Sequence, residues 1–182
     1  MVRLRLLRHR ELSDGVLPPD YTHDDAGDRS ERDLTVSLAE VRAAAIGLLA
    51  YREFSTAELV DRLESRGHGR HLVERAVQQL AEEGLQSDQR FTEVFVRSRL
   101  NKGQGPMLIR GELRARGIDE LLINEHLTLD ESFWIENAHE AALKRFKMLA
   151  ETREGWAAQA RFLARRGFPS SVIYAALGDQ HH

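Results

Sequence analysis

Apolar residues recur at helical spacing along most of the chain, and one short pattern returns three times. The stretches RLESRG, GELRARG and RFLARRG end at Gly67, Gly117 and Gly167, so the interval is 50 residues each time. Apolar residues align across the copies at four further positions: Leu63, Leu113 and Leu163; Val73, Ile123 and Ile173; Val77, Leu127 and Leu177; and Ile46, Val96 and Phe146. Similarity at a fixed period predicts an array of repeated structural units.

Each copy has the pattern of three helices. The first is predicted to be long and to cover 41–52, 88–102 and 131–153. The second begins with Ser55 and Glu58 in the spacing of a capping box, and with Gly105-Pro106 in the next copy. The repeated glycine follows its last turn, where a positive φ is easily adopted. The third helix of the first copy is expected to stop at Gly84.

These elements predict an all-α fold: a tandem repeat of three three-helix units forming an elongated, curved array. The expected repeats are 39–86, 87–130 and 131–179, because no sustained period-2 alternation typical of strands follows Leu38. Residues 1–38 are interpreted as an N-terminal tail. Its stretch 13–37 contains Pro18-Pro19, two glycines and six aspartates, a composition typical of disorder.

Composition narrows the class of function. The chain of 182 residues has 26 basic and 29 acidic side chains, so its net charge of −3 does not indicate a nucleic-acid partner. Cysteine is absent, which excludes disulfides, thiol catalysis and cysteine-based zinc sites. We find neither a signal peptide at the basic start nor an apolar run of membrane-spanning length, so a cytoplasmic protein is expected.

Motifs for chemistry are weak. Gly103-Gln104-Gly105 resembles part of a nucleotide-binding loop, but Leu108 stands where the third glycine should be and no strand precedes it. His68 and His71 are spaced i, i+3 across a helix boundary without a third ligand nearby, which favours surface histidines. We therefore expect no catalysis, no metal and no cofactor.

Cations gather around the middle repeat and continue into the third. Arg110 and Arg114 are four apart on one helix, where like charges repel. Arg99 stands where the other copies have Leu49 and Leu149, so it is either buried against a carboxylate or lines a cleft facing a partner. The predicted basic strip, a surface for a carboxylate- or phosphate-bearing partner, comprises Arg97, Arg99, Lys102, Arg110, Arg114, Arg161, Arg165 and Arg166.

The stretch RFTEVFVRSRLNKGQGPMLIRGELRARGI resembles the signature of the bacterial RecX regulatory proteins. The resemblance covers 39–178 and rests on Phe91, Val96-Arg97, Arg99, the Gly-x-Gly-Pro at 103–106, Ile109, Glu112-Leu113 and Arg116-Gly117. It implies tandem three-helix units that bind in the groove of the RecA recombinase filament on DNA. It also implies negative modulation of filament growth, ATP hydrolysis, strand exchange and co-protease activity, in recombination, DNA repair and the SOS response.

Two other interpretations stay open. Three-helix units can place a helix in the major groove, so a DNA-binding module is one of them, and single- or double-stranded DNA is a possible secondary partner. A helical scaffold for some other protein is the second. Residues 39–85 carry six basic and eight acidic side chains, so protein contact is expected to outweigh DNA contact. We expect a monomer.

Overall fold

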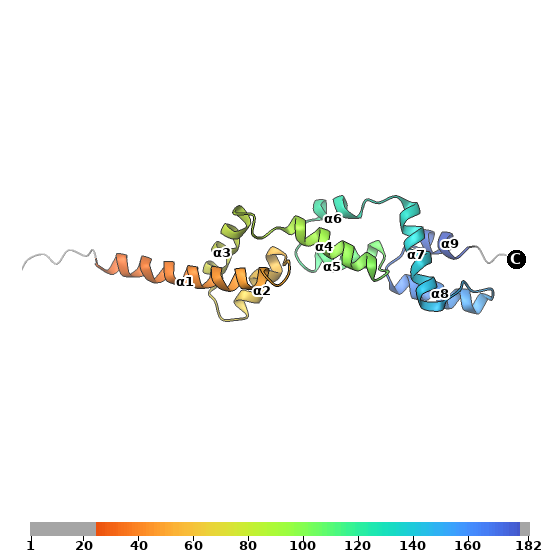
Figure 1. Cartoon of the computed structure of the whole chain (residues 1–182), viewed down its shortest axis with the longest axis horizontal. Helices are drawn as coiled ribbons and strands as arrows, with labels where there is room; N and C mark the ends of the chain where they lie inside the picture. The colour runs from red at the N-terminus through yellow and green to blue at the C-terminus, as the bar shows by residue number, and fades with distance from the viewer. Residues whose placement is uncertain (1–24, 179–182) are drawn as a thin grey trace, which may run out of the picture.

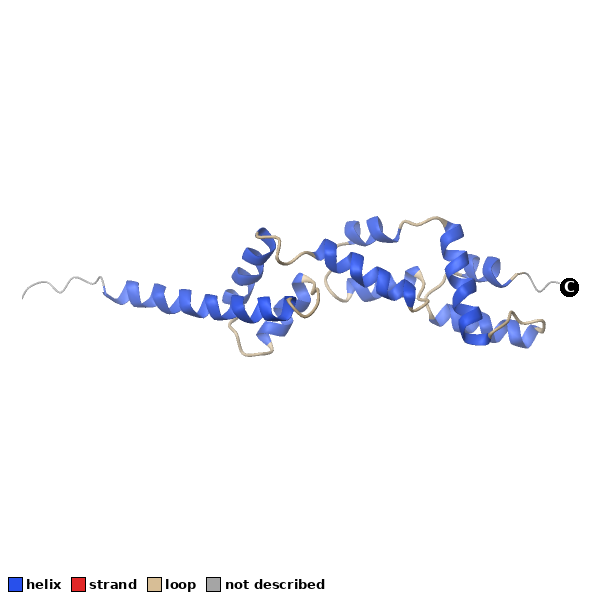
Figure 2. Ribbon diagram, in the orientation of Figure 1, coloured by secondary structure: helices blue, strands red, loops and turns tan. Residues whose placement is uncertain are grey.

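The structure, a computed structural model, describes residues 25–178, with side chains from residue 37 onward. Within that range it contains only helices, joined by short loops (Figure 2). Their bounds are α1 Asp25–Leu49, α2 Thr56–Glu64, α3 Arg70–Glu82, α4 Asp88–Asn101, α5 Pro106–Arg114, α6 Glu120–Leu127, α7 Glu131–Phe146, α8 Arg153–Arg165 and α9 Ser170–Leu177. The all-α prediction is confirmed.

The helices form three groups of three that follow one another along the long axis of the molecule (Figure 1). Contacts between helices are concentrated within α1–α3, within α4–α6 and within α7–α9, which we call the first, second and third units. The array is elongated, as the repeat predicts. No helix of the described part combines the length and apolar composition needed to cross a bilayer.

The first helix begins earlier than expected. Residues 25–38 were assigned to the tail, and residues 13–37 were expected to be disordered, but the structure places residues 25–38 in α1. This part of the helix projects away from the first unit (Figure 1). The remaining tail, residues 1–24, lies outside the described residues.

The long first helix predicted for the third copy, over 131–153, is also wrong. It ends at Phe146, because Lys147 has φ +73°, and a new helix begins after the N-cap Thr152. The buried Gln159 stabilises this break: it donates to the carbonyl of Met148 at 2.8 Å and accepts from the amide of Ala150 at 3.2 Å. Leu149 therefore lies in a loop, not in a first helix.

The predicted cap of α2 is confirmed for Ser55, whereas the Glu58 carboxylate pairs with Arg52 and Arg116. Ser55 Oγ accepts from the amide of Glu58 at 3.1 Å, and Pro106 occupies the first turn of α5. The repeated Gly67, Gly117 and Gly167 all have positive φ, between 73° and 90°. Each ends the second helix of its unit, as the spacing indicated.

Most of the repeated apolar positions form the cores. Leu63, Leu113 and Leu163 are completely buried, and the aligned positions on the third helices are nearly so. The fourth aligned set is not equivalent, because Ile46 is 43% exposed and Phe146 is only half-buried, whereas Val96 is buried. The buried residues of the first unit form one cluster, whereas those of the second and third units form a continuous one.

Candidate partner-binding surface

Adjacent units meet at the ends of their second helices, through hydrogen bonds to a backbone carbonyl. At the first junction, Ser55 Oγ donates to the carbonyl of Arg116 at 2.8 Å. At the second, the amide of Gly105 donates to the carbonyl of Arg166 at 2.8 Å. Both pairs are offset by the same 50 residues, so the sequence repeat is also a repeat of how one unit docks on the next.

Glycine is required at the second junction. A Cβ on Gly105 would stand 2.5 Å from the carbonyl oxygen of Gly167, and a Cβ on Gly167 would stand 2.4 Å from the amide nitrogen of Leu108. The amide of Met107 also donates to the Gly167 carbonyl at 3.0 Å. The Gly-x-Gly-Pro motif is therefore a helix start whose glycine permits close backbone contact between units.

Arg110 and Arg114 lie on α5 and share one carboxylate. Glu120, at the start of α6, is hydrogen-bonded by Arg110, and by Arg114 Nε at 2.7 Å. The hydrogen bond from Arg114 is the main cause that lowers the pKa of Glu120, and the same bond raises the pKa of Arg114. This carboxylate offsets the repulsion expected between the two arginines.

Arg99 is half-buried against a carboxylate and also lines a cleft; that the cleft faces a partner stays a prediction. Its Nε donates to Glu112 at 2.6 Å, and its side chain is 19% exposed. It also lines a cleft between the first and second units, together with Arg52 and Arg116. Arg99 and Leu49 both lie near the end of the first helix of their units, so these two positions are equivalent. Leu149 is not equivalent to them, because it lies in the α7–α8 connection.

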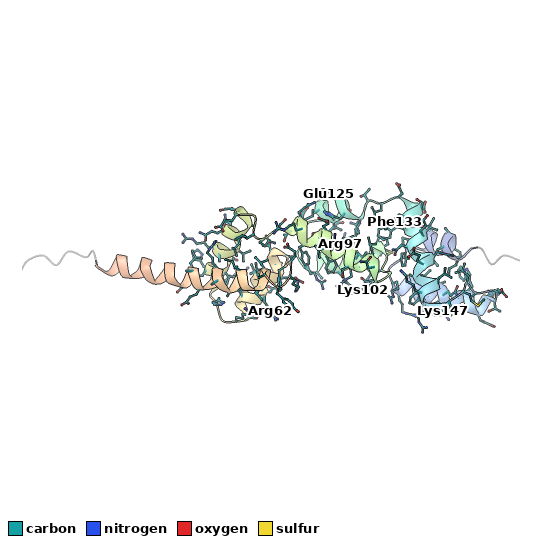
Figure 3. The ribbon with its side chains drawn as sticks, in the orientation of Figure 1. Arg62, Arg97, Lys102, Glu125, Phe133 and Lys147 are labelled. Atoms are coloured by element: carbon teal, nitrogen blue, oxygen red, sulfur yellow. The ribbon has the colours of Figure 1, made fainter. Side chains whose placement is uncertain are left out.

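Arg97 lies elsewhere on α4. Residues two apart on a helix are about 200° apart around its axis, so Arg97 and Arg99 face different sides. Arg97 pairs with Glu93 at 3.7 Å and lines a cavity of about 450 Å³ between α4 and α7. Phe133 lies across this cavity, at the start of α7 (Figure 3).

The other predicted cations are at the second junction and on α8. Lys102 is exposed where α4 meets the third unit (Figure 3), and its carbonyl accepts from Arg166. Arg161 and Arg165 are exposed on one face of α8 and have no ion pair among the described side chains. The structure thus brings together Arg110 with Arg114, and Lys102 with Arg166, while Arg97 and Arg99 line separate hollows.

Sequence reasoning missed the carboxylate partners and the aromatic contacts. Glu112 and Glu120 are separated from their arginines by a turn, so no i, i+4 spacing reveals them. The guanidinium of Arg99 stacks over Phe95, 4.1 Å from the ring centroid. Within residues 37–178, no group of three or more potential ligands is placed to hold a metal ion.

Three-helix units in tandem, docked through their second helices, define a class of helical repeat protein. Three family models match this chain in order: the first three-helix domain of RecX at residues 42–80, the second at 87–127 and the third at 133–177. The chain belongs to the RecX family.

Relatives and solved structures agree with this assignment. The chain is 47% identical over 144 residues to "Regulatory protein RecX" of Chromohalobacter salexigens, which covers 79% of this chain and 95% of the relative. It is 45% identical over 138 residues to the protein of that name from Halorhodospira halophila, covering 75% and 85%. A crystal structure of regulatory protein RecX superposes with a TM-score of 0.74 at 25% identity, over 85% of this chain and 78% of that one. RecX from Lactobacillus salivarius, at 22% identity, has the same fold, with a TM-score of 0.68 over 78% of this chain and 95% of that one.

Proposed function

We propose that this protein binds the RecA recombinase filament on DNA and negatively modulates its assembly, ATP hydrolysis, strand exchange and co-protease activity. The observation that carries the proposal is the match of all three units to RecX domains, since the curated relatives are named regulatory proteins. An elongated array can contact several subunits of a filament at once, and such multivalent contact raises affinity without any tight single site. The protein acts by binding, without a cofactor, in the cytoplasm.

In this proposal four cations of the basic strip make two kinds of contact. Arg161 and Arg165 are exposed and have no ion pair with any described side chain, so they are available to acidic or phosphate groups of the filament. Arg110 and Arg114 must first be released from Glu120, or bind an anion alongside it. A test of the strip therefore starts with α8.

A variant series follows from this division. Arg161→Gln with Arg165→Gln should lower filament affinity about tenfold without changing thermal stability, because neither side chain has an ion pair in the described structure. Glu120→Gln should raise affinity, because it frees Arg110 and Arg114. If affinity is unchanged in both variants, the strip does not bind the filament.

DNA binding is the second candidate function. The exposed, unpaired cations favour it, while the overall acidic balance opposes it. Anisotropy of labelled protein, titrated with RecA filaments or with bare DNA at several salt concentrations, separates the two. Binding to filaments far above binding to bare DNA supports the RecA proposal. Equal binding to bare DNA, falling steeply with salt, would replace it with the DNA module. Binding to neither would leave a scaffold for another protein.

A further inference from the structure

A cleft of about 300 Å³ lies where the α1–α2 connection faces α4, between the first and second units. Arg52, Arg99 and Arg116 line it, each from a different element of the fold. We call it the arginine cleft. Its apolar lining is formed by Phe91, Val94 and Phe95.

The arginines of the cleft outnumber their carboxylate partners. Glu58 pairs with Arg52 at 3.0 Å and with Arg116 at 3.1 Å, while Glu112 pairs with Arg99 at 2.6 Å. Glu53, which also lines the cleft, pairs with Arg90, so the whole network has four guanidiniums for three carboxylates. One positive charge remains in excess in a half-buried place, where it is worth more than on the open surface.

Aromatic rings hold these guanidiniums in place. Arg99 and Arg116 both lie over Phe95, with 4.1 and 4.8 Å between the guanidinium carbon and the ring centroid. The side-chain hydrogen bond of Arg99 is made by Nε, which leaves the two terminal amino groups of its fork for another acceptor. A guanidinium with its fork held open suits bidentate contact with a carboxylate.

A further charged group of the cleft is a carboxylate. Glu53 lines the cleft, and its Oε1 is paired with Arg90 Nε at 3.0 Å. Its Oε2 has no hydrogen-bond partner among the described residues and is itself buried, so Glu53 contributes negative charge to the cleft and no exposed acceptor for a ligand.

The repeat does not explain the cleft. Fifty residues after Arg52 and Glu58, the chain has Lys102 and Leu108, and of the three arginines only Arg116 has an arginine counterpart, Arg166. The second junction docks well without this network, through the backbone contacts at Gly105 and Gly167. The cluster of arginines at the first junction is therefore not a requirement for joining units.

We propose that the arginine cleft docks an extended segment of the protein partner that carries one aspartate or glutamate flanked by apolar residues. The carboxylate binds the open fork of Arg99 and the terminal amino group of Arg116 that does not donate to the Glu112 carbonyl, and an apolar neighbour packs on Val94 beside Phe91. That the partner is the RecA filament rests on the proposed function. The chemistry of the segment rests on the cleft alone.

A nucleic acid fits the cleft less well. The excess of one positive charge matches a single carboxylate, whereas a phosphate backbone would bring further charges close to Glu53 and Glu58. This balance of charge favours a peptide.

NMR of the full chain tests the chemistry directly. Acetyl-Leu-Glu-Leu-amide should shift the Nε–H signals of Arg99 and Arg116, and acetyl-Leu-Gln-Leu-amide should bind about tenfold more weakly, since a charged hydrogen bond is lost. Arg99→Lys, which keeps the charge but removes the fork, should weaken the glutamate peptide similarly. The proposal would be overturned if oligothymidylate shifted the signals of the cleft and the peptide did not. It would also be overturned if neither probe shifted them.

A matched control is available in the first unit. Arg42 is 24% exposed and pairs with Glu83 at 2.9 Å, so Arg42→Lys makes the same change away from the cleft. Arg99→Lys should lower the affinity for RecA filaments at least about fivefold. Arg42→Lys should retain full affinity, and the two variants should have equal melting temperatures. Equal losses in the two variants would refute the cleft as a contact. If the unaltered protein fails to bind filaments, the proposed function fails, and the peptide titration still decides the cleft.

Discussion

Single glycines decide how the units join. Gly167 combines φ +86° with a contact that leaves no room for a Cβ beside Leu108. Gly111, in the middle of α5, has ordinary helical geometry and open space around it. The same substitution should therefore have opposite effects at the two positions.

Gly167→Ala is expected to destabilise the protein by about 1–3 kcal/mol, because the left-handed backbone and the clash both oppose the methyl group. Gly111→Ala should stabilise it by about 0.5–1 kcal/mol, because alanine loses less conformational entropy in a helix. Urea unfolding followed by circular dichroism measures both. A destabilised Gly111→Ala, or a neutral Gly167→Ala, would contradict this account.

Glu120 should titrate below the ordinary range of a glutamate, chiefly because Arg114 hydrogen-bonds it and thereby lowers its pKa. Because the pKa of Glu120 is lower in the folded than in the unfolded protein, its ionised carboxylate stabilises the fold at pH values above the pKa of the unfolded state. That contribution is lost as the pH falls through the folded pKa. Arg114→Gln should raise the pKa of Glu120, as carbon-13 NMR of its carboxyl group can measure. An unchanged titration midpoint would show that the pair does not exist in solution.

Helix starts and stops were predictable where they depend on neighbouring residues. Ser55 with Glu58, and the repeated glycines after the second helices, act within one turn, so their patterns are visible in the sequence. The end of α7 was not predictable in this way, because the connection after it is stabilised by Gln159, thirteen residues beyond Phe146. The partners of Arg99, Arg110 and Arg114 were missed for the same reason: they come from neighbouring helices.

The α7–α8 connection should depend on that one side chain. Gln159→Leu keeps a similar volume but removes the hydrogen bonds to the backbone of Met148 and Ala150. We expect the free energy of unfolding to fall by about 1–3 kcal/mol, the usual cost of removing one partner of a buried hydrogen bond and leaving the other unsatisfied. The exposed Gln78→Leu is the control, and its free energy of unfolding should change by less than about 0.5 kcal/mol. Equal effects of the two changes would contradict the role given to Gln159.

At the scale of the molecule, the first unit should unfold on its own. Its buried residues form a separate cluster, whereas the second and third units share one. Leu63→Ala should cost about 2–5 kcal/mol and speed amide exchange in α2 and α3 while α4–α9 stay protected. Leu113→Ala should affect both later units. Hydrogen exchange followed by mass spectrometry measures protection in each unit separately. A uniform loss of protection over all three units in both variants would mean one cooperative core and would contradict this prediction.

The measurement that tests the central claim most directly is single-stranded-DNA-dependent ATP hydrolysis by the cognate RecA, titrated with this protein. The account predicts that hydrolysis falls, and falls already at substoichiometric amounts if the protein blocks filament extension. Unchanged hydrolysis, with RecA filaments present throughout the titration, would contradict it.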